Sequence, residues 1–291
     1  MKSGGAFMKP FLCIDLTSDK KNTAVNGEEF LTATPSLASS QSLEDSQSEA
    51  KEKLEQSKLP KPLRIIQTVC GFTGFLILVS ILRAMNSVTF SEAYQNVPFL
   101  FWIIGICLLI WLILFLFGLY RKKTVLSTEE STRTFEYLES REEALFSELG
   151  VPATAKDADV FFFYYKTKGD KLKISQKGTQ NAPYLTKTFK AFADAENLHL
   201  ADLTGRYSFP VSSIKGIRTV TKHTVIDKWT KPYVYNKGIY QQYKLQIDQY
   251  GRVHCKNHHV MSIERDGELW EVYIPCYELP LFEKLTGLKA E

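Results

Sequence analysis

Two long apolar runs lie close together in the first half of the chain. Residues 65–82 and 98–119 contain no charged side chain. A run of about 18 or more apolar residues is long enough to cross the hydrocarbon core of a bilayer. In lipid such a segment must satisfy its own backbone hydrogen bonds, and a helix does so. The sequence therefore predicts a two-helix transmembrane hairpin, with helices over 63–84 and 98–120 joined by an external loop over 85–97.

The charges beside these runs predict the orientation of the hairpin. The flanking basic residues are Lys58, Lys61, Arg64, Arg121, Lys122 and Lys123. Residues 84–97 contain no lysine or arginine, and only Arg83 opposes the trend. Because basic residues accumulate on the cytoplasmic side, both flanks are expected in the cytoplasm. The expected protein is thus a multi-pass protein of the plasma membrane with cytoplasmic N and C termini.

The residue types within the two apolar runs indicate whether the hairpin could transport ions and how its helices could pack. Neither run contains Asp, Glu, Lys, Arg or His, which argues against a channel or transporter built from the hairpin alone. Gly71, Gly74 and Gly105 permit close helix packing, either within the hairpin or between copies of the chain. We favour packing within the hairpin.

The segment before the first run divides into two parts. Residues 1–35 contain two short strand candidates around an Asn26-Gly27 turn, so we expect a cytoplasmic β-hairpin segment. Since an isolated hairpin is marginal in water, we expect it to dock on the C-terminal domain. Residues 36–62 are rich in Ser, Gln, Glu and Lys, which predicts a polar linker or a loose helix.

A helix is predicted directly after the second run, over residues 125–150. Ser127 and Glu130 have the spacing of a capping box. Apolar residues then recur at helical spacing on one side. Gly150 stands where such a helix is expected to stop. This amphipathic helix is expected to connect the membrane hairpin to the domain that follows and to pack on that domain.

The remaining residues, 156–291, have the pattern of a mostly β domain. Short alternating segments are separated by turn residues, and Asp266-Gly267 is a strong hairpin signal. Strands at this spacing indicate a small barrel or sandwich. Residues 279–285 predict a short helix whose apolar side closes one end of the sheet. We therefore expect an α+β, mostly β cytoplasmic domain.

A family resemblance rests on three stretches of this domain. They are Leu200-Ala201-Asp202-Leu203, Phe209-Pro210-Val211-Ser212-Ser213-Ile214, and Ile217. With the strand spacing, the closing helix and the position after a membrane hairpin, residues 158–288 resemble a bacterial pleckstrin-homology-like (PH-like) domain. The resemblance implies a PH-like barrel or sandwich with a C-terminal helix. It also implies a domain that binds, scaffolds or oligomerises rather than one that catalyses, and it assigns no specific site.

Positive charge is concentrated within this domain. Residues 166–256 contain seventeen Lys and Arg against six Asp and Glu. Anionic lipid headgroups attract such a segment, although scattered lysines also protect edge strands from aggregation. The candidates for lipid or partner binding are Lys228, Trp229, Lys231, Tyr233, Tyr235 and Lys237. Aromatic side chains beside lysines suit a membrane interface, whereas single-stranded nucleic acid fits a tethered domain less well; a core role for the aromatics is the alternative.

Candidates for catalysis and metal binding are few. His254, Cys255, His258 and His259 lie within six residues, but in a strand their side chains alternate between two faces. Lys256 would also repel a cation. We therefore expect a polar hairpin turn and no metal. Five cysteines without paired spacing argue against a disulfide framework. Phosphate-binding loops and nucleophile elbows are absent from the sequence, so no catalytic residue and no cofactor are expected.

These expectations combine in one function hypothesis. The chain is expected to be a membrane-anchored, non-enzymatic binding or scaffolding protein of bacterial type. Its expected partners are membrane lipids, with anionic headgroups or a cytoplasmic protein as further partners, and no nucleic acid. A membrane-tethered sensor or regulator that binds a small ligand or a protein is the first alternative, and an unrecognised enzyme is the second.

Overall fold

The computed structural model separates the chain into two compact units. The residues that it describes are 9–16, 27–84, 94–168, 171–228 and 238–291. One unit comprises residues 1–36 together with 144–291, and the other comprises residues 37–143. The first unit is a β domain and the second is helical. The β domain is therefore built from two stretches of chain that the helical unit interrupts.

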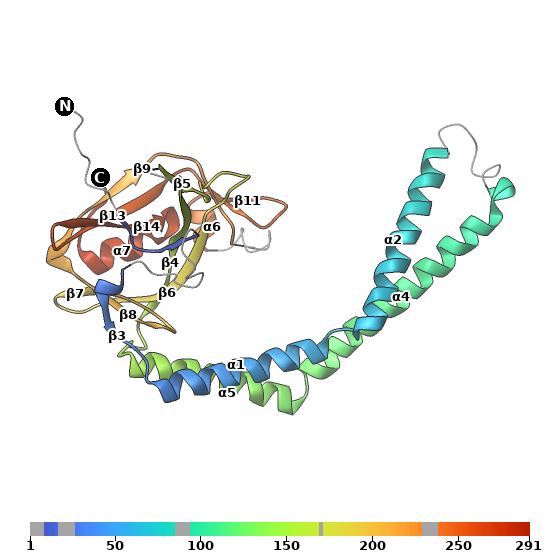
Figure 1. Cartoon of the computed structure of the whole chain (residues 1–291), viewed down its shortest axis with the longest axis horizontal. Coiled ribbons are helices and arrows are strands. Elements are labelled where there is room, and N and C mark those ends of the chain that lie inside the picture. The colour runs from blue at the N-terminus through green and yellow to red at the C-terminus, as the bar shows by residue number, and fades with distance from the viewer. Residues whose placement is uncertain (1–8, 17–26, 85–93, 169–170, 229–237) are drawn as a thin grey trace. The chain divides into compact units, whose positions relative to one another are not determined.

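Long helices make up the helical unit (Figure 1). They are α1 (Leu37–Ser57), α2 (Lys61–Ala84), α4 (Pro98–Leu126) and the greater part of α5 (Glu129–Glu148). Two stretches, Lys61–Arg83 and Pro98–Leu126, are long and apolar enough to span a membrane. Only 11% and 6% of their most apolar windows are buried. Their apolar surface is thus not covered as it would be in the core of a globular domain.

The helices α2 and α4 pack against each other at small residues. A Cβ atom on Gly71 would lie 3.0 Å from Cδ1 of Trp111, and one on Gly74 would lie 3.6 Å from Cβ of Cys107. A Cβ atom on Gly105 would meet no heavy atom within 4 Å. Gly71 and Gly74 therefore allow close approach within the hairpin.

The expected polar linker is a helix. Residues Leu37–Ser57 form α1, which runs beside α5 (Figure 1). The hydroxyl of Thr134 donates a hydrogen bond to Glu49 (3.2 Å), and Lys53 forms an ion pair with Glu130. The buried side chains of α1 are Leu43, Ser46, Ala50 and Ser57, so most of them are small. The low apolar content of this stretch was the reason to expect either a polar linker or a loose helix. The structure shows a helix.

The boundaries of α5 follow local capping rules, with one correction. Thr128, rather than Ser127, caps the helix, because its hydroxyl accepts a hydrogen bond from the N–H of Ser131 (3.2 Å). At the other end, Gly150 has φ of 70° and donates its N–H to the carbonyl of Ser147 (2.9 Å). The N–H of Val151 bonds to the carbonyl of Phe146, as in a Schellman motif. The predicted stop at Gly150 is confirmed.

In the described residues, the strands of the β domain form three sheets. The largest has the strand order β2-β4-β6-β7-β8-β3, with β5 also paired to β4. Its later strands are β4 (Lys156–Lys168), β5 (Lys171–Ile174), β6 (Leu185–Ala193), β7 (Asn197–Asp202) and β8 (Gly205–Pro210). A second sheet has the order β1-β14-β13-β9, and a third has the order β10-β12-β11.

The remaining elements complete these sheets and close the domain. The strands are β9 (Ile214–Val220), β10 (Thr224–Ile226), β11 (Gln246–Ile247), β12 (Val253–Cys255), β13 (His258–Arg265) and β14 (Glu268–Pro275). The short helices are η1 (Glu28–Phe30), η2 (Val211–Ser213), α6 (Ile239–Gln242), η4 (Cys276–Glu278) and α7 (Leu279–Thr286). The turn between β13 and β14 has positive φ at Asp266 (54°) and Gly267 (77°), as a type I′ hairpin requires. Phe282 of α7 is fully buried, so α7 closes the core as expected.

The N-terminal segment is not a hairpin in the described residues. β1 (Lys9–Pro10) pairs parallel to β14, β2 (Cys13–Asp15) pairs parallel to β4, and β3 (Leu31–Ala33) pairs antiparallel to β8. The three strands therefore join different strands of the β domain instead of one another. Burial explains this outcome, because the domain core offers large apolar side chains a site that a free hairpin lacks.

The main core draws on both stretches of the chain. Phe11 and Phe30 come from the N-terminal segment and are fully buried. The ring centroids of Phe11 and Phe209 lie 5.1 Å apart, and those of Phe30 and Trp270 lie 5.5 Å apart. These edge-on contacts are the geometry that aromatic rings favour. The N-terminal segment is thus part of the core rather than a cover on it.

Candidate functional site

The predicted lipid- or partner-binding patch is described at one of its six positions. Trp229, Lys231, Tyr233, Tyr235 and Lys237 lie outside the described residues. Lys228 forms an ion pair with the buried carboxylate of Asp159, and its Nζ lies 5.4 Å from the ring centroid of Tyr277. The domain therefore holds Lys228 in place through contacts that the sequence did not indicate.

Asp159 is the centre of a buried polar cluster. It lies on β4 and is 1% exposed. Thr188 donates a hydrogen bond to its Oδ1 (2.7 Å), and the hydroxyl of Tyr277 donates one to its Oδ2 (2.9 Å). The N–H of Asp159 in turn donates to Oε1 of Glu278 (3.2 Å). The cluster therefore connects β4, β6 and the segment that follows β14.

Burial changes the acidity of two members of this cluster. It raises the pKa of Glu278 to about 7. Burial and the neighbouring Asp159 carboxylate raise the pKa of Tyr277 well above its usual value. A carboxyl that titrates near neutrality is a candidate acid–base group. Here its contact is a backbone N–H of the fold, so the arrangement fits a structural clamp better than a catalytic site.

A second cluster has the residue types of a hydrolytic triad. Nε2 of His199 lies 2.8 Å from Oδ2 of Asp194, and its Nδ1 lies 2.8 Å from Oγ of Ser208. His199 and Ser208 are directly opposite in the pairing of β7 with β8. Sequence reasoning missed this cluster because register, not motif spacing, brings these residues together.

The surroundings of Ser208 do not suit nucleophilic attack. The residue is 7% exposed, and its Oγ also lies 2.6 Å from Oγ1 of Thr32. A catalytic hydroxyl must reach a substrate. Ser208, on β8, instead connects β3 and β7 through its contacts with Thr32 and His199. Asp194 accepts hydrogen bonds from the N–H groups of Glu196 (2.8 Å) and Asn197 (2.7 Å), which shapes the turn between β6 and β7.

Within the histidine-rich stretch, His258 and His259 are neighbours in β13 and contact different residues. Nδ1 of His258 lies 3.1 Å from Oγ1 of Thr224, whereas Nδ1 of His259 lies 3.2 Å from Oγ1 of Thr219. Burial lowers the pKa of His258 to about 4. Within the described ranges, no group of three or more His, Cys, Asp or Glu residues is placed to hold a metal ion. The expected polar hairpin turn is wrong, because the flanking strands β12 and β13 belong to different sheets.

The lysines of the positively charged stretch, residues 166–256, differ in their surroundings. Lys187, Lys190 and Lys215 form ion pairs with Asp202, Asp157 and Glu264, respectively. In the arm formed by β4 and β5, by contrast, the register places Lys166 opposite Lys173, and both side chains are exposed. Directly opposed like charges destabilise a strand pair. An anion at this arm would relieve that repulsion, so the arm is a candidate anion-contact surface.

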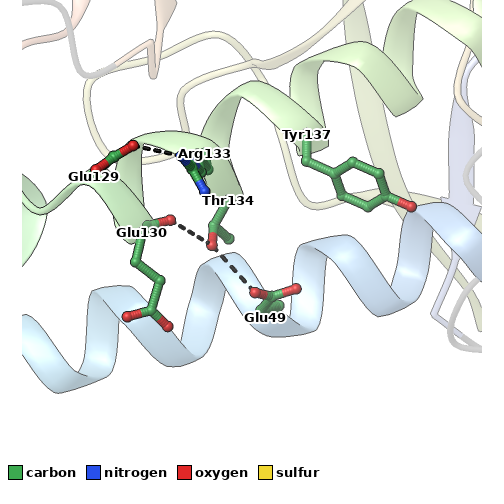
Figure 2. A pocket seen from close by; sticks show the side chains of 6 residues that line it. All are labelled: Glu49, Glu129, Glu130, Arg133, Thr134 and Tyr137. Atoms are coloured by element: carbon green, nitrogen blue, oxygen red, sulfur yellow. Dashed lines mark hydrogen bonds and ion pairs between the residues drawn. The ribbon is translucent and has the colours of Figure 1, made fainter.

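A hollow of about 520 Å³ lies between α1 and α5 (Figure 2). Its lining residues are Glu49, Glu129, Glu130, Arg133, Thr134 and Tyr137. Arg133 donates a hydrogen bond to Glu129 (2.5 Å), and Thr134 donates to Glu49 (3.2 Å). These polar groups pair with one another. The hollow therefore reflects helix pairing, and an acidic lining alone indicates no ligand.

Comparison with family models, curated proteins and solved structures found no match to this chain. The resemblance of the C-terminal region to PH-like domains remains a prediction from its sequence.

Proposed function

We propose that this chain is an integral membrane protein that holds a PH-like binding or scaffolding domain at the cytoplasmic face of the membrane. The observation that carries the proposal is the exposed apolar surface of α2 and α4. Only 11% of the most apolar window of α2 is buried, and only 6% of that of α4. Exposing apolar surface to water costs roughly 25 cal/mol per Å². A bilayer removes that cost along both helices.

The charge distribution supports the proposed orientation. Arg64 lies in the first turn of α2, and Arg121, Lys122 and Lys123 lie in the last turns of α4. Residues 84–97, between the two helices, contain no lysine or arginine. Basic residues remain on the cytoplasmic side during insertion. Both ends of the hairpin, and the β domain with them, are therefore assigned to the cytoplasm in this proposal.

The strand order supports the PH-like assignment. Strands β4, β6, β7 and β8 form an antiparallel run of neighbours in chain order. Strands β9, β13 and β14 form a second antiparallel group, and α7 follows β14 after the short helix η4. Two groups of antiparallel strands and a closing C-terminal helix fit the barrel or sandwich that the resemblance implies. The strands from the N-terminal segment are additions to this plan.

Binding rather than catalysis fits the side chains of the β domain. Glu278 and His199, which are candidates for acid–base chemistry, are hydrogen-bonded within the fold. Lys166 and Lys173, in contrast, are exposed and opposed on the β4–β5 arm. Anionic headgroups attract lysines near a membrane surface by about 1 kcal/mol each. The proposed ligand of this arm is therefore an anionic membrane surface.

Cysteine labelling tests the orientation. Ser91 lies in the proposed external loop, and Ser140 is an exposed residue of α5. A membrane-impermeant maleimide should label the S91C variant in intact cells and the S140C variant only after permeabilisation. The wild-type chain, which retains its own five cysteines, measures the background. Labelling of S140C in intact cells would show that the orientation is wrong.

Amine footprinting tests the proposed binding surface. The full-length chain is placed in nanodiscs of neutral lipid or of neutral lipid mixed with anionic lipid. Acetylation of Lys166 and Lys173 should be several-fold slower on the anionic discs, and high salt should restore the rate. Lys215, which is paired with Glu264, is the internal control and should react equally on both. Equal rates at Lys166 and Lys173 on the two discs would contradict lipid binding by the arm.

A further inference from the structure

A second hollow of about 520 Å³ lies where the end of α1 and the start of α2 meet the last turns of α4. Its basic lining residues are Lys51, Lys58, Arg64 and Lys122, and its acidic one is Glu55. All of them belong to the helical unit. Four positive charges and one negative charge give this lining a net charge of +3. Such a lining is complementary to an anion.

The acidic residue does not offset the remaining positive charge. Glu55 forms an ion pair with Lys58, and this hydrogen bond is the main cause that holds the pKa of Glu55 below its usual value. Lys51, Arg64 and Lys122 thus remain as the excess. Arg64 donates one hydrogen bond from Nη2 to the carbonyl of Leu59 (3.1 Å), which orients the side chain. Its guanidinium has five N–H donors, so others remain available to a ligand.

The uncharged part of the lining consists of Leu54, Leu59, Gly118, Ser57 and Gln67. Most of the surface of the hollow is apolar. The first uncharged apolar run begins at residue 65, next to Arg64, and Gly118 lies one helical turn before Lys122. If α2 and α4 cross a membrane as proposed above, this hollow lies at the depth of the lipid headgroups. Its basic side chains then lie at the aqueous ends of the two spans, whereas Gln67 and Gly118 lie within the uncharged runs themselves.

We propose that this hollow binds the phosphate headgroup of an anionic phospholipid from the cytoplasmic leaflet. Arg64, Lys51 and Lys122 contact the phosphate, and the acyl chains lie along the exposed apolar surface of α2 and α4. Basic pockets between membrane helices on the cytoplasmic side are suited to such headgroups. A free phosphate ion carries the same charge but leaves the apolar part of the lining unused. The proposal rests on the proposed membrane insertion and adds a specific lipid site to it.

Lipid titration of the detergent-purified full-length chain tests the proposal. Native mass spectrometry counts bound phosphatidylglycerol, with phosphatidylcholine of the same acyl chains as the neutral comparison. The R64Q/K122Q variant removes two charges of the lining. The K61Q/K123Q variant removes two charges from the same two helices at residues outside the lining. Wild type and K61Q/K123Q should bind phosphatidylglycerol about tenfold more tightly than R64Q/K122Q, and phosphatidylcholine should bind weakly to all three.

Each other outcome overturns the proposal. Equal weakening in both variants would show a general charge effect rather than a site. Displacement of phosphatidylglycerol by inorganic phosphate at equal concentration would assign the hollow to a soluble anion. A separate measurement tests the membrane insertion on which this proposal rests. If alkaline carbonate extracts the wild-type chain from membranes, the chain is not an integral membrane protein, and the proposed lipid site is wrong as well.

Discussion

Two buried polar residues of the β domain, Asp159 and Ser208, have partners that lie far away in the chain. Asp159 pairs with Lys228, 69 residues later, and with Tyr277, 118 residues later. Thr32 and Ser208 are separated by 176 residues. A buried charge or hydroxyl without a partner would cost more than such a contact returns. These contacts therefore specify which segments pack together, and they leave the chemistry of Asp159 and Ser208 committed to the fold.

Glu278 gives a pH-dependent prediction at this scale. Burial raises its pKa from 4.5 to about 7, so the folded chain holds this proton more tightly than the unfolded chain does. The resulting stability is fully present below the unfolded pKa and is lost as the pH rises through the folded pKa. Between roughly pH 5 and pH 8, the free energy of unfolding of wild type should fall by about 1–3 kcal/mol relative to that of the E278Q variant, as measured by thermal unfolding.

The E29Q variant, which changes an exposed carboxyl, is the control and should follow wild type. Parallel pH profiles for wild type and E278Q would contradict the assignment.

The elements of the helical unit depend on small residues at their contacts. Ser46 and Ala50 are buried in α1, and Gly71 lies against Trp111 between α2 and α4. Large apolar side chains are what sequence patterns detect most readily. This explains why the two apolar helices were evident from the sequence, whereas α1, most of whose buried residues are small, was expected as a polar linker or a loose helix. The spacing of Gly71 and Gly74 was visible in the sequence, but its partner on α4 was not.

Gly71 provides a test of the hairpin contact. A leucine at this position would place its Cβ 3.0 Å from Cδ1 of Trp111 and the rest of its side chain between the helices. Overpacking of this kind typically costs about 1–3 kcal/mol. The G71L variant should therefore unfold at a lower temperature than wild type in detergent. The G105L variant is the matched control, since its added Cβ would meet no heavy atom within 4 Å. Equal unfolding temperatures for G71L and wild type would argue that these helices are not packed here.

At the scale of the whole molecule, one β domain is assembled from both sides of the helical unit. Residues 1–36 and 144–291 form one compact unit. The N–H of Ser36 donates a hydrogen bond to Oε1 of Glu148 (2.7 Å), so the two stretches come together where the helical unit begins and ends. A fragment limited to the C-terminal region would lose Phe11 and Phe30 from its core. The helical unit is thus an insertion between strands of a single domain.

This arrangement predicts that the helical unit can be removed. A chain in which a short Gly-Ser linker replaces residues 37–143 should fold into a β domain with cooperative thermal unfolding, followed by circular dichroism. A second chain that also lacks residues 1–36 leaves Phe209 and Trp270 without their aromatic partners from the N-terminal segment, and it should not unfold cooperatively. Cooperative unfolding of the second chain would show that the N-terminal strands are dispensable.

The sequence by itself determined the features that are encoded within a few neighbouring residues. The two apolar runs are long helices, Gly150 ends α5 with a positive φ, and Asp266-Gly267 forms a tight hairpin turn. Each follows from hydropathy or from backbone preferences that act locally. Only the tertiary structure decided that β1, β2 and β3 join three different strands and that Lys228 pairs with Asp159. Those choices depend on which distant segments bury their apolar and polar groups together, and no local pattern contains that information.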